Sequence, residues 1–293
     1  MANFDIYAAI TDRIIAELEN GIIPWHKPWT ATPPGATPRE PARPYPLLNQ
    51  MLLGTPGEYL TWNQVKKEGG SVKKGAKAKM VVFWKVYPRE KKNTDGQTIT
   101  DAEGKPVMEG LPVLRYFNVF HIDDCEGIKP KYTAENTKHA DPIQYAEETF
   151  ADYVSRSGVR FENVRQDRAY YSPSQDLIRL PLMEQFPDTA EYYSTLFHEA
   201  THSTGHAKRL DRLPKDAIAA HFGSEEYSKE ELVAEIGAAS ILNVLGIETA
   251  GTFKNSAAYI RSWLKALKND KRMIVSAAAR AEKAVKLILN TAE

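Results

Sequence analysis

One segment of the chain places two histidines and a glutamate in the order that binds a catalytic metal. His198, Glu199 and His202 form the pattern His-Glu-x-x-His within LFHEATHSTGH. Histidines four residues apart lie about 40° apart around a helix, so both imidazoles can reach one ion. Glu199 can take a proton from a water at the open coordination position. The alternative is a solvated helix with two idle histidines, and the apolar Leu196 and Phe197 on the same helix favour the metal site instead.

A catalytic zinc ion usually has three protein ligands, so a third ligand must come from elsewhere. His206 is close in sequence, but the longer pattern HExxHxxGxxH needs a histidine at position 208, which is Lys208. The segment SKEELVAEIGAAS carries Glu231 and Glu235 four residues apart on one helical face. One carboxylate can bind the metal while the other orients a ligand histidine through its free ring nitrogen. Glutamates at this spacing also commonly solvate a helix, and that alternative stays open.

The spacing of these two acids resembles that of glutamate zincins, in which the first acid is the ligand. The resemblance implies that Glu231 binds the metal and that Glu235 lies in the outer shell. The expected ion is Zn²⁺, with another divalent metal such as Mn²⁺ as the alternative. The implied chemistry is metal-assisted hydrolysis, with Glu199 as general base and then acid.

A second region combines positive charge with aromatic side chains. Residues 66–92 contain ten basic and two acidic residues, a local net charge of +8. Tryptophans and tyrosines lie within and before this run. Lysines neutralise phosphates and aromatic rings stack on bases, which indicates single-stranded nucleic acid, because a duplex hides its bases.

The residues predicted to contact nucleic acid are the basic and aromatic side chains of this run and of the proline-rich stretch before it. They are Trp25, Lys27, Trp29, Tyr45, Trp62, Lys66, Lys67, Lys73, Lys74, Lys77, Lys79, Trp84 and Lys85. The alternative is that the charges form a solvated face and the aromatic residues belong to a core.

The elements that must position these residues follow from hydrophobic periodicity and turn signals. The pattern predicts helices over 4–20, 60–68, 142–157, 189–205 and 228–245, and a helical tail from about 255. Two strands are predicted over 77–87 and 113–122, and two short ones lie on either side of the turn PSQD. The six prolines between 33 and 46 predict an extended loop.

Composition limits the class of protein. The chain has 293 residues, a formal net charge of zero, 42% hydrophobic residues and 26% charged residues. These values predict a folded protein with no membrane span. The predicted helices and strands together correspond to an α+β fold. Cys125 is the only cysteine, which excludes an internal disulfide and favours the cytoplasm. The composition shift near KPKYTAENTKHADP predicts a first domain over 1–130, a linker over 131–140 and a second domain over 141–293.

Both halves resemble one family. The N-terminal motifs NGIIPWHKPW, LTWNQVKKEGGSVKKGAKAKMVVFWKVY and VLRYFNVFHIDDCEGI are similar to the ArdC-type domain, which in that family binds single-stranded DNA. The motifs YYSPSQDLIRLP, LFHEATHSTGHAKRL, KEELVAEIGAA and AAYIRSWLKALKNDKRMI are similar to the zincin-like metallopeptidase domain that follows it. The resemblance covers nearly all of the chain. It implies a mobile-element protein that protects incoming DNA from host restriction, with His198, His202 and Glu231 as metal ligands and Glu199 as acid/base.

Three hypotheses follow from these observations. The first is a single-stranded-DNA-binding antirestriction protein with a zincin domain. The second is a DNA-stimulated metalloprotease that cleaves a host protein, such as a restriction subunit. The third is a binding module whose metal only holds the fold.

Overall fold

The structure is a computed structural model, and it describes residues 4–26, 35–41, 43–131, 141–213, 225–247 and 256–291. The α+β class expected from the sequence is confirmed, since the chain combines helices with small sheets that contain antiparallel and parallel strand pairs. None of the helices within these ranges is long and apolar enough to cross a membrane.

The chain forms two compact units that interleave along the sequence. Unit 1 contains Met1–Ile6 and Leu60–Ile128, and unit 2 contains Tyr7–Tyr59 and Lys129–Glu293. The segment predicted as the first domain, 1–130, therefore does not correspond to one compact unit. Its residues 7–59 are packed with the C-terminal half of the chain.

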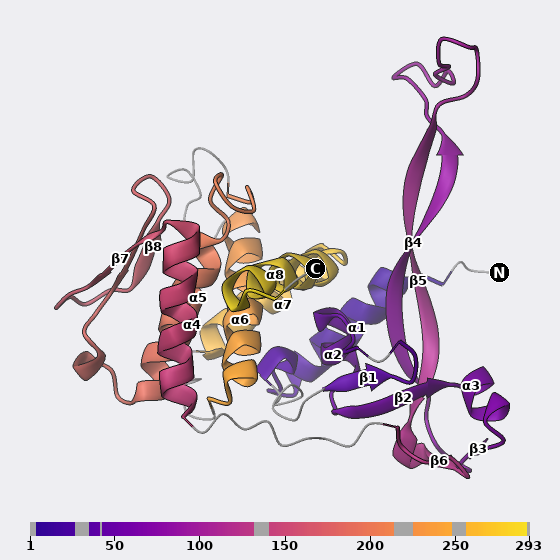
Figure 1. Ribbon diagram of the computed structural model, residues 1–293, viewed down its shortest axis with the longest axis horizontal. Coiled ribbons are helices and arrows are strands. Elements are labelled where there is room, and N and C mark those ends of the chain that lie inside the picture. The colour runs from indigo at the N-terminus through magenta and orange to yellow at the C-terminus, as the bar shows by residue number, and fades with distance from the viewer. Residues whose placement is uncertain are drawn as a thin grey trace. The chain divides into compact units, whose positions relative to one another are not determined.

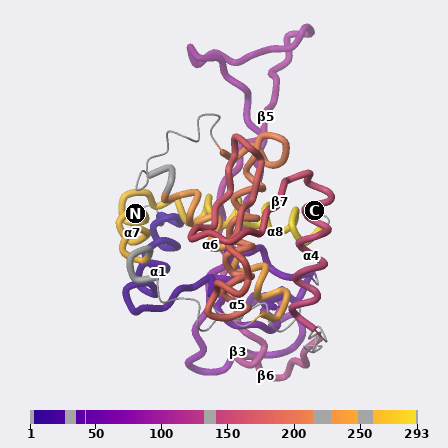
Figure 2. Tube along the Cα trace, turned by 90° about the vertical axis from the view of Figure 1, so that its left-hand side faces the viewer, coloured from indigo at the N-terminus to yellow at the C-terminus, as the bar shows by residue number. Residues whose placement is uncertain are grey.

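A long two-stranded ribbon dominates unit 1. Strand β4 (Lys79–Glu90) pairs with β5 (Met108–His121) in antiparallel register, from Lys79 opposite Val119 to Glu90 opposite Met108. Both strands are rich in β-branched and aromatic residues, which favour extended backbone. Figure 1 shows the two strands running together, and β5 is labelled in the turned view of Figure 2.

A small hydrophobic cluster holds the base of the ribbon. It contains Leu60, Val65, Ile122 and Cys125, and it lies among α3 (Trp62–Lys67), η2 (Ile122–Asp124), and the strand pair β3 (Ser71–Val72) and β6 (Cys125–Glu126). Helix α3 begins at a capping box, because Thr61 and Gln64 each bond the other's backbone N–H. Gly70 is required here, since a Cβ at this position would lie 2.6 Å from the carbonyl oxygen of Glu126.

The N-terminal part of unit 2 starts with α1 (Ile6–Glu19), whose buried face is Ile10, Thr11, Ile14 and Leu18. It continues through η1 (Pro24–His26) to β1 (Ala36–Pro38), α2 (Leu47–Leu53) and β2 (Gly57–Thr61), which crosses into unit 1. The sequence predicted only a loop where β1 pairs in parallel with β2. The side-chain amide of Gln50 bonds the backbone N–H and C=O of Ala36, which fixes this short proline-rich segment as a strand.

A three-stranded sheet and helix α4 (Pro142–Ser157) form one side of the C-terminal part of unit 2. The central strand β9 (Leu177–Leu180) pairs in parallel with β7 (Arg160–Asn163) and antiparallel with β8 (Tyr170–Ser172). The predicted hairpin about PSQD is therefore present as β8 and β9, and β7 is a strand that the sequence did not predict.

Four helices complete unit 2. After η3 (Met183–Gln185) come α5 (Thr189–Ser203), α6 (Glu225–Leu245), α7 (Ser256–Asn269) and α8 (Met273–Leu289), so the predicted helical tail is two helices. Helix α6 lies beside α5 (Figure 1), and the approach is close. A Cβ on Gly237 would lie 2.6 Å from Cγ2 of Thr201, so glycine lets the two helices meet.

Candidate metal centre and candidate nucleic-acid interface

Helix α5 has two faces with different surroundings. Asp188 caps its first turn by accepting a hydrogen bond from the backbone N–H of Glu191 at 2.8 Å. Leu196, Phe197 and Ala200 lie in the main core of unit 2, each at most 2% exposed. The core therefore fixes the rotation of the helix, and His198 and His202 point away from it toward α6.

The structure brings His198, His202 and Glu231 together. The Nε2 atoms of the two histidines lie 3.1 Å apart. One Glu231 oxygen lies 3.5 Å from Nε2 of His198 and the other lies 3.4 Å from Nε2 of His202. Ligand atoms around a tetrahedral zinc, with bonds of about 2.0–2.1 Å, are separated by about 3.3–3.4 Å. Two imidazoles and one carboxylate at these separations fit a divalent metal.

The outward-facing nitrogen of each histidine also has a carboxylate beside it. Nδ1 of His198 lies 3.7 Å from Glu235, the residue that the sequence placed in the outer shell. Nδ1 of His202 lies 3.3 Å from Glu230, which the sequence analysis missed. In each imidazole, Nε2 points to the position that a metal would occupy, and Nδ1 lies beside a carboxylate. A carboxylate at the second nitrogen fixes the orientation of the ring in metal sites.

Arg212 holds Glu230 in place. Its Nε donates to one Glu230 oxygen at 2.8 Å and its Nη2 donates to the other at 2.7 Å. The same guanidinium donates to the carbonyl oxygen of Thr201 at 2.9 Å and to Oγ1 of Thr204 at 3.0 Å. Arg212 therefore ties the end of α5 to α6. The sequence signal for Glu230 was its position next to Glu231 in KEEL, although the sequence analysis predicted a role for Glu231 alone.

The charges of the cluster raise the pKa values of the two histidines and lower the pKa of Glu231. Burial alone would lower the pKa of His202, but hydrogen bonds to Glu230 and Glu231 raise it well above its usual value. The pKa of His198 is raised in the same way, chiefly by Glu231. Burial would raise the pKa of Glu231, yet the two histidines lower it strongly. The carboxylate is therefore anionic, as a metal ligand must be.

Glu199 lies at the same site and is 9% exposed. Its carboxylate acts electrostatically on both His198 and His202, so it is close to the three-residue cluster without belonging to it. A divalent metal bound there supplies Lewis acidity that polarises a carbonyl and acidifies a nearby water. The role of Glu199 as general base and then acid stays a prediction from the sequence pattern.

We expect Glu230→Gln to weaken the affinity for Zn²⁺ or Mn²⁺ by about 10- to 100-fold, because His202 loses an anionic partner at Nδ1. Isothermal titration of the metal-stripped protein measures this change. Glu162→Gln is the matched control, because Glu162 pairs with Arg179 on the β7–β9 strand pair. An affinity equal to that of the unchanged chain would show that Glu230 has no influence on the metal.

The turn after α5 is held by a second buried arginine. Arg209 donates to the carbonyl oxygen of Ser203 at 2.7 Å and pairs with both oxygens of Asp176, to which Tyr171 also donates at 2.9 Å. Burial opposes ionisation of Asp176, but these hydrogen bonds lower its pKa. His206 faces Asp176 at 3.9 Å, so it belongs to this anchor and not to the metal cluster.

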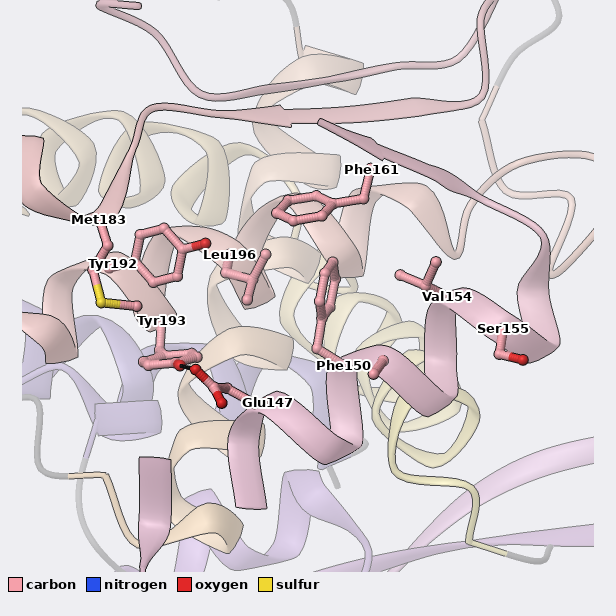
Figure 3. Close-up of a pocket in the computed structure, with 10 residues that line it drawn as sticks. Glu147, Phe150, Val154, Ser155, Phe161, Met183, Tyr192, Tyr193 and Leu196 are labelled. Atoms are coloured by element: carbon pink, nitrogen blue, oxygen red, sulfur yellow. Dashed lines mark hydrogen bonds between the residues drawn. The ribbon is translucent and has the colours of Figure 1, made fainter. Parts of the chain in front are cut away.

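A cavity of about 470 Å³ lies on another face of α5 (Figure 3). Tyr192, Tyr193 and Leu196 contribute from this helix, and Phe150 and Phe161 close it from α4 and β7. The hydroxyl of Tyr193 donates to Glu147 at the rim, at 3.1 Å. These residues lie on the side of α5 away from His198 and His202. The cavity is therefore separate from the metal cluster.

The ribbon of unit 1 has two chemically different faces. Residues opposite each other in an antiparallel pair share a face, and residues two apart along a strand do too. The register thus puts Phe83, Lys85, Tyr87, Arg115 and Phe117 on one face, here called the basic ribbon face. The two phenylalanine rings lie 6.1 Å apart, and Nζ of Lys85 lies 5.1 Å from the ring centre of Tyr87.

The opposite face, here called the apolar ribbon face, carries no basic residue between Met80 and Pro88. It contains Trp84, Val86 and Tyr116, which are 52%, 63% and 43% exposed. Trp84 and Lys85 therefore lie on different faces, although the sequence predicted both as nucleic-acid contacts. The sequence analysis missed Arg115 and Phe117, for which the alternation in LRYFNVF was the available signal.

The other predicted nucleic-acid contacts fall into three groups. Trp62, Lys66, Lys67, Lys73, Lys74 and Lys77 are exposed, Lys79 is half-buried, and Nζ of Lys66 lies 5.3 Å from the ring centre of Trp62. Lys27 and Trp29 lie outside the described residues. Trp25 and Tyr45 are 0% and 6% exposed. Their rings are part of the core of unit 2 and have no free face for a base, so we remove both from the nucleic-acid interface.

Comparison with known proteins gives the same two-part picture. Residues 4–120 match the model for the N-terminal domain of anti-restriction factor ArdC, and residues 148–280 match a zincin-like metallopeptidase. The DNA primase TraC of Escherichia coli is 37% identical over 96% of this chain, which spans 26% of the primase. The protein y4eC of Sinorhizobium fredii is 30% identical over 95% of this chain and 89% of its own length.

Two crystal structures of the antirestriction protein ArdC from the R388 plasmid share the fold along nearly the whole chain. The metal-free structure has a TM-score of 0.73 and 35% identity, and covers 97% of both chains. The Mn(II)-bound structure has the same TM-score, 34% identity and 98% coverage of both chains. The chain therefore belongs to the ArdC antirestriction family and combines an ArdC N-terminal domain with a zincin-like metallopeptidase domain.

Proposed function

We propose that this chain binds single-stranded DNA through unit 1 and protects incoming DNA from host restriction. We propose further that its divalent-metal site holds Zn²⁺, or Mn²⁺ as the alternative, in a peptidase-like centre. The blocks predicted from the sequence, 1–130 and 141–293, differ from these units, because residues 7–59 belong to unit 2. The observation that carries the DNA proposal is the basic ribbon face, where exposed aromatic rings and cations occupy the same side of two paired strands.

This face offers both interactions that a single strand needs. Phe83 and Phe117 are 38% and 47% exposed, so part of each ring is accessible for stacking by a base. Lys85 and Arg115 are exposed beside them and can neutralise phosphates. A duplex has its bases already stacked and paired, and only the charges would then contribute. The face therefore favours single strands.

Phe117→Ala is expected to weaken single-strand binding by about 5- to 150-fold, because one stacked base contributes roughly 1–3 kcal/mol. Fluorescence anisotropy of the full chain with a labelled oligonucleotide measures the loss. Trp84→Ala, on the apolar ribbon face, is the matched control and should leave the affinity nearly unchanged. An equal loss in both variants would show that the basic ribbon face is not the selective site.

The salt dependence of binding tests the charges separately. The logarithm of the affinity should fall linearly with the logarithm of salt concentration, and Lys85→Ala should reduce the slope by about 0.7. Glu90→Gln removes a neighbouring charge of the other sign and should not reduce the slope. A slope unaffected by Lys85→Ala would mean that this lysine is only solvated.

A second candidate function is a DNA-stimulated metalloprotease that cleaves a host protein, such as a restriction enzyme. The complete cluster of His198, His202 and Glu231, with Glu199 beside it, favours a site capable of hydrolysis. The two proposals differ in whether hydrolysis is needed for protection of DNA.

A further inference from the structure

The N-terminal segment of unit 2 is packed firmly onto the helices of the peptidase-like part. The ring of Trp25 is fully buried and meets Trp263 of α7 edge to face, with ring centres 5.3 Å apart. Oγ1 of Thr11 donates to the carbonyl oxygen of Lys271 at 2.7 Å, and Glu19 pairs with Lys268 at 2.7 Å. Helix α1 and η1 are thus held in place by α7 and the turn between α7 and α8.

The residue after Trp25 lies at the metal centre. Nε2 of His26 lies 3.8 Å from one oxygen of Glu235, and the other Glu235 oxygen lies 3.7 Å from Nδ1 of His198. The side chain of His26 is 10% exposed, and that of Glu235 is 25% exposed. One carboxylate therefore stands between an imidazole from the N-terminal segment and an imidazole of the metal cluster.

We infer that His26 is a positioning residue of the metal centre, which holds the Glu235 carboxylate toward His198; this inference rests on the proposed binding of a divalent metal there. Glu235 is on α6, and a quarter of its side chain is open to solvent. With Nε2 of His26 3.8 Å from one oxygen, the carboxylate keeps its other oxygen facing His198. Without that polar contact, the side chain is free to rotate toward water.

His26 and Glu235 come from two different segments of the chain. His26 falls in the segment that matches the ArdC N-terminal domain, whereas the ligands and Glu235 fall in the segment that matches the metallopeptidase. A pattern search within the peptidase segment alone would find Glu235 but not the residue that orients it. The N-terminal segment therefore completes the outer shell of a site that the other segment builds.

Two substitutions separate a positioning role from simple packing. His26→Phe keeps an aromatic ring but removes the donor, and His26→Gln keeps a donor but removes the ring. We expect His26→Phe to weaken the affinity for Zn²⁺ by about 10- to 100-fold and His26→Gln to retain most of it. Isothermal titration of the metal-stripped full chain gives the affinity, and thermal melting of the metal-free protein checks that both variants fold. The reverse order of the two variants would show that the ring only fills space.

A double-substitution cycle tests whether His26 acts through Glu235. In a Glu235→Gln background, His26→Phe should produce little further loss, because the carboxylate that it orients has gone. If His26→Phe weakens metal affinity by the same factor with and without Glu235→Gln, the two residues act independently and the inference is overturned. The proposed metal binding is judged separately: if the unchanged chain binds no Zn²⁺ or Mn²⁺, that proposal fails, whereas full binding by both the unchanged chain and His26→Phe overturns only the role of His26.

Discussion

Replacing Glu199 by glutamine is expected to reduce kcat/KM for peptide hydrolysis by about 10²- to 10⁴-fold, the usual contribution of a general acid–base. The amide cannot accept the proton that the carboxylate accepts, although its size and position are nearly unchanged. The measurement uses the metal-loaded full chain and a quenched-fluorescence peptide library. Glu191→Gln, in the first turn of the same helix, is the matched control and should retain the rate of the unchanged chain.

The same substitution distinguishes the two candidate functions. Metal affinity should be preserved in Glu199→Gln, because His198, His202 and Glu231 are intact. If protection of DNA comes from single-strand binding, transfer of unmodified DNA into a restricting host should remain as efficient as with the unchanged chain. Loss of protection together with loss of hydrolysis would instead support the metalloprotease that cleaves a host protein.

Replacing Glu58 by glutamine is expected to lower the free energy of unfolding of unit 2 by about 3–5 kcal/mol, as when one partner of a buried ion pair is removed. Nη1 of Arg39 donates to Glu58 at 2.5 Å, and the two side chains are 5% and 1% exposed. The other Glu58 oxygen accepts a hydrogen bond from the backbone N–H of Lys131 at 2.7 Å. Glutamine leaves the arginine charge buried without its counter-charge. Urea unfolding followed by circular dichroism measures the change.

A double replacement provides the control for this ion pair. Arg39→Met with Glu58→Leu removes both charges and keeps apolar volume, so much of the lost stability should return. A loss below about 1 kcal/mol in Glu58→Gln would contradict the expectation, because it would mean that water screens the pair as it does at an exposed surface.

The local part of the metal centre could be predicted from sequence because its geometry is set by one helix. The spacing of His198 and His202 fixes both imidazoles on one side of α5, and the adjacent apolar residues fix which side faces the core. Glu231 and Glu235 followed from the same helical spacing together with the family resemblance. Glu230 and Arg212 could not be ranked above neighbouring charges, because their roles depend on how α5 and α6 approach each other at Thr201 and Gly237.

The nucleic-acid contacts show why composition identifies a region better than it identifies residues. The charge of residues 66–92 indicated the ribbon, but only the register of β4 and β5 shows that Lys85 and Trp84 lie on opposite faces. Trp25 and Tyr45 are predicted as nucleic-acid contacts because they are aromatic and lie near the basic run in the sequence. Periodicity cannot show that Trp25 packs against Trp263, more than two hundred residues away.

The interleaving of the two units affects how such genes can recombine. The match to the primase covers 96% of this chain within a much longer protein, so the relative carries both segments together. A crossover between residues 128 and 148 would keep each recognisable motif whole, yet it would pair Trp25 with a foreign α7 and His26 with a foreign α6. The N-terminal segment and the helices that it packs on therefore need to be matched, and we expect hybrids joined at the motif boundary to lose stability and metal affinity.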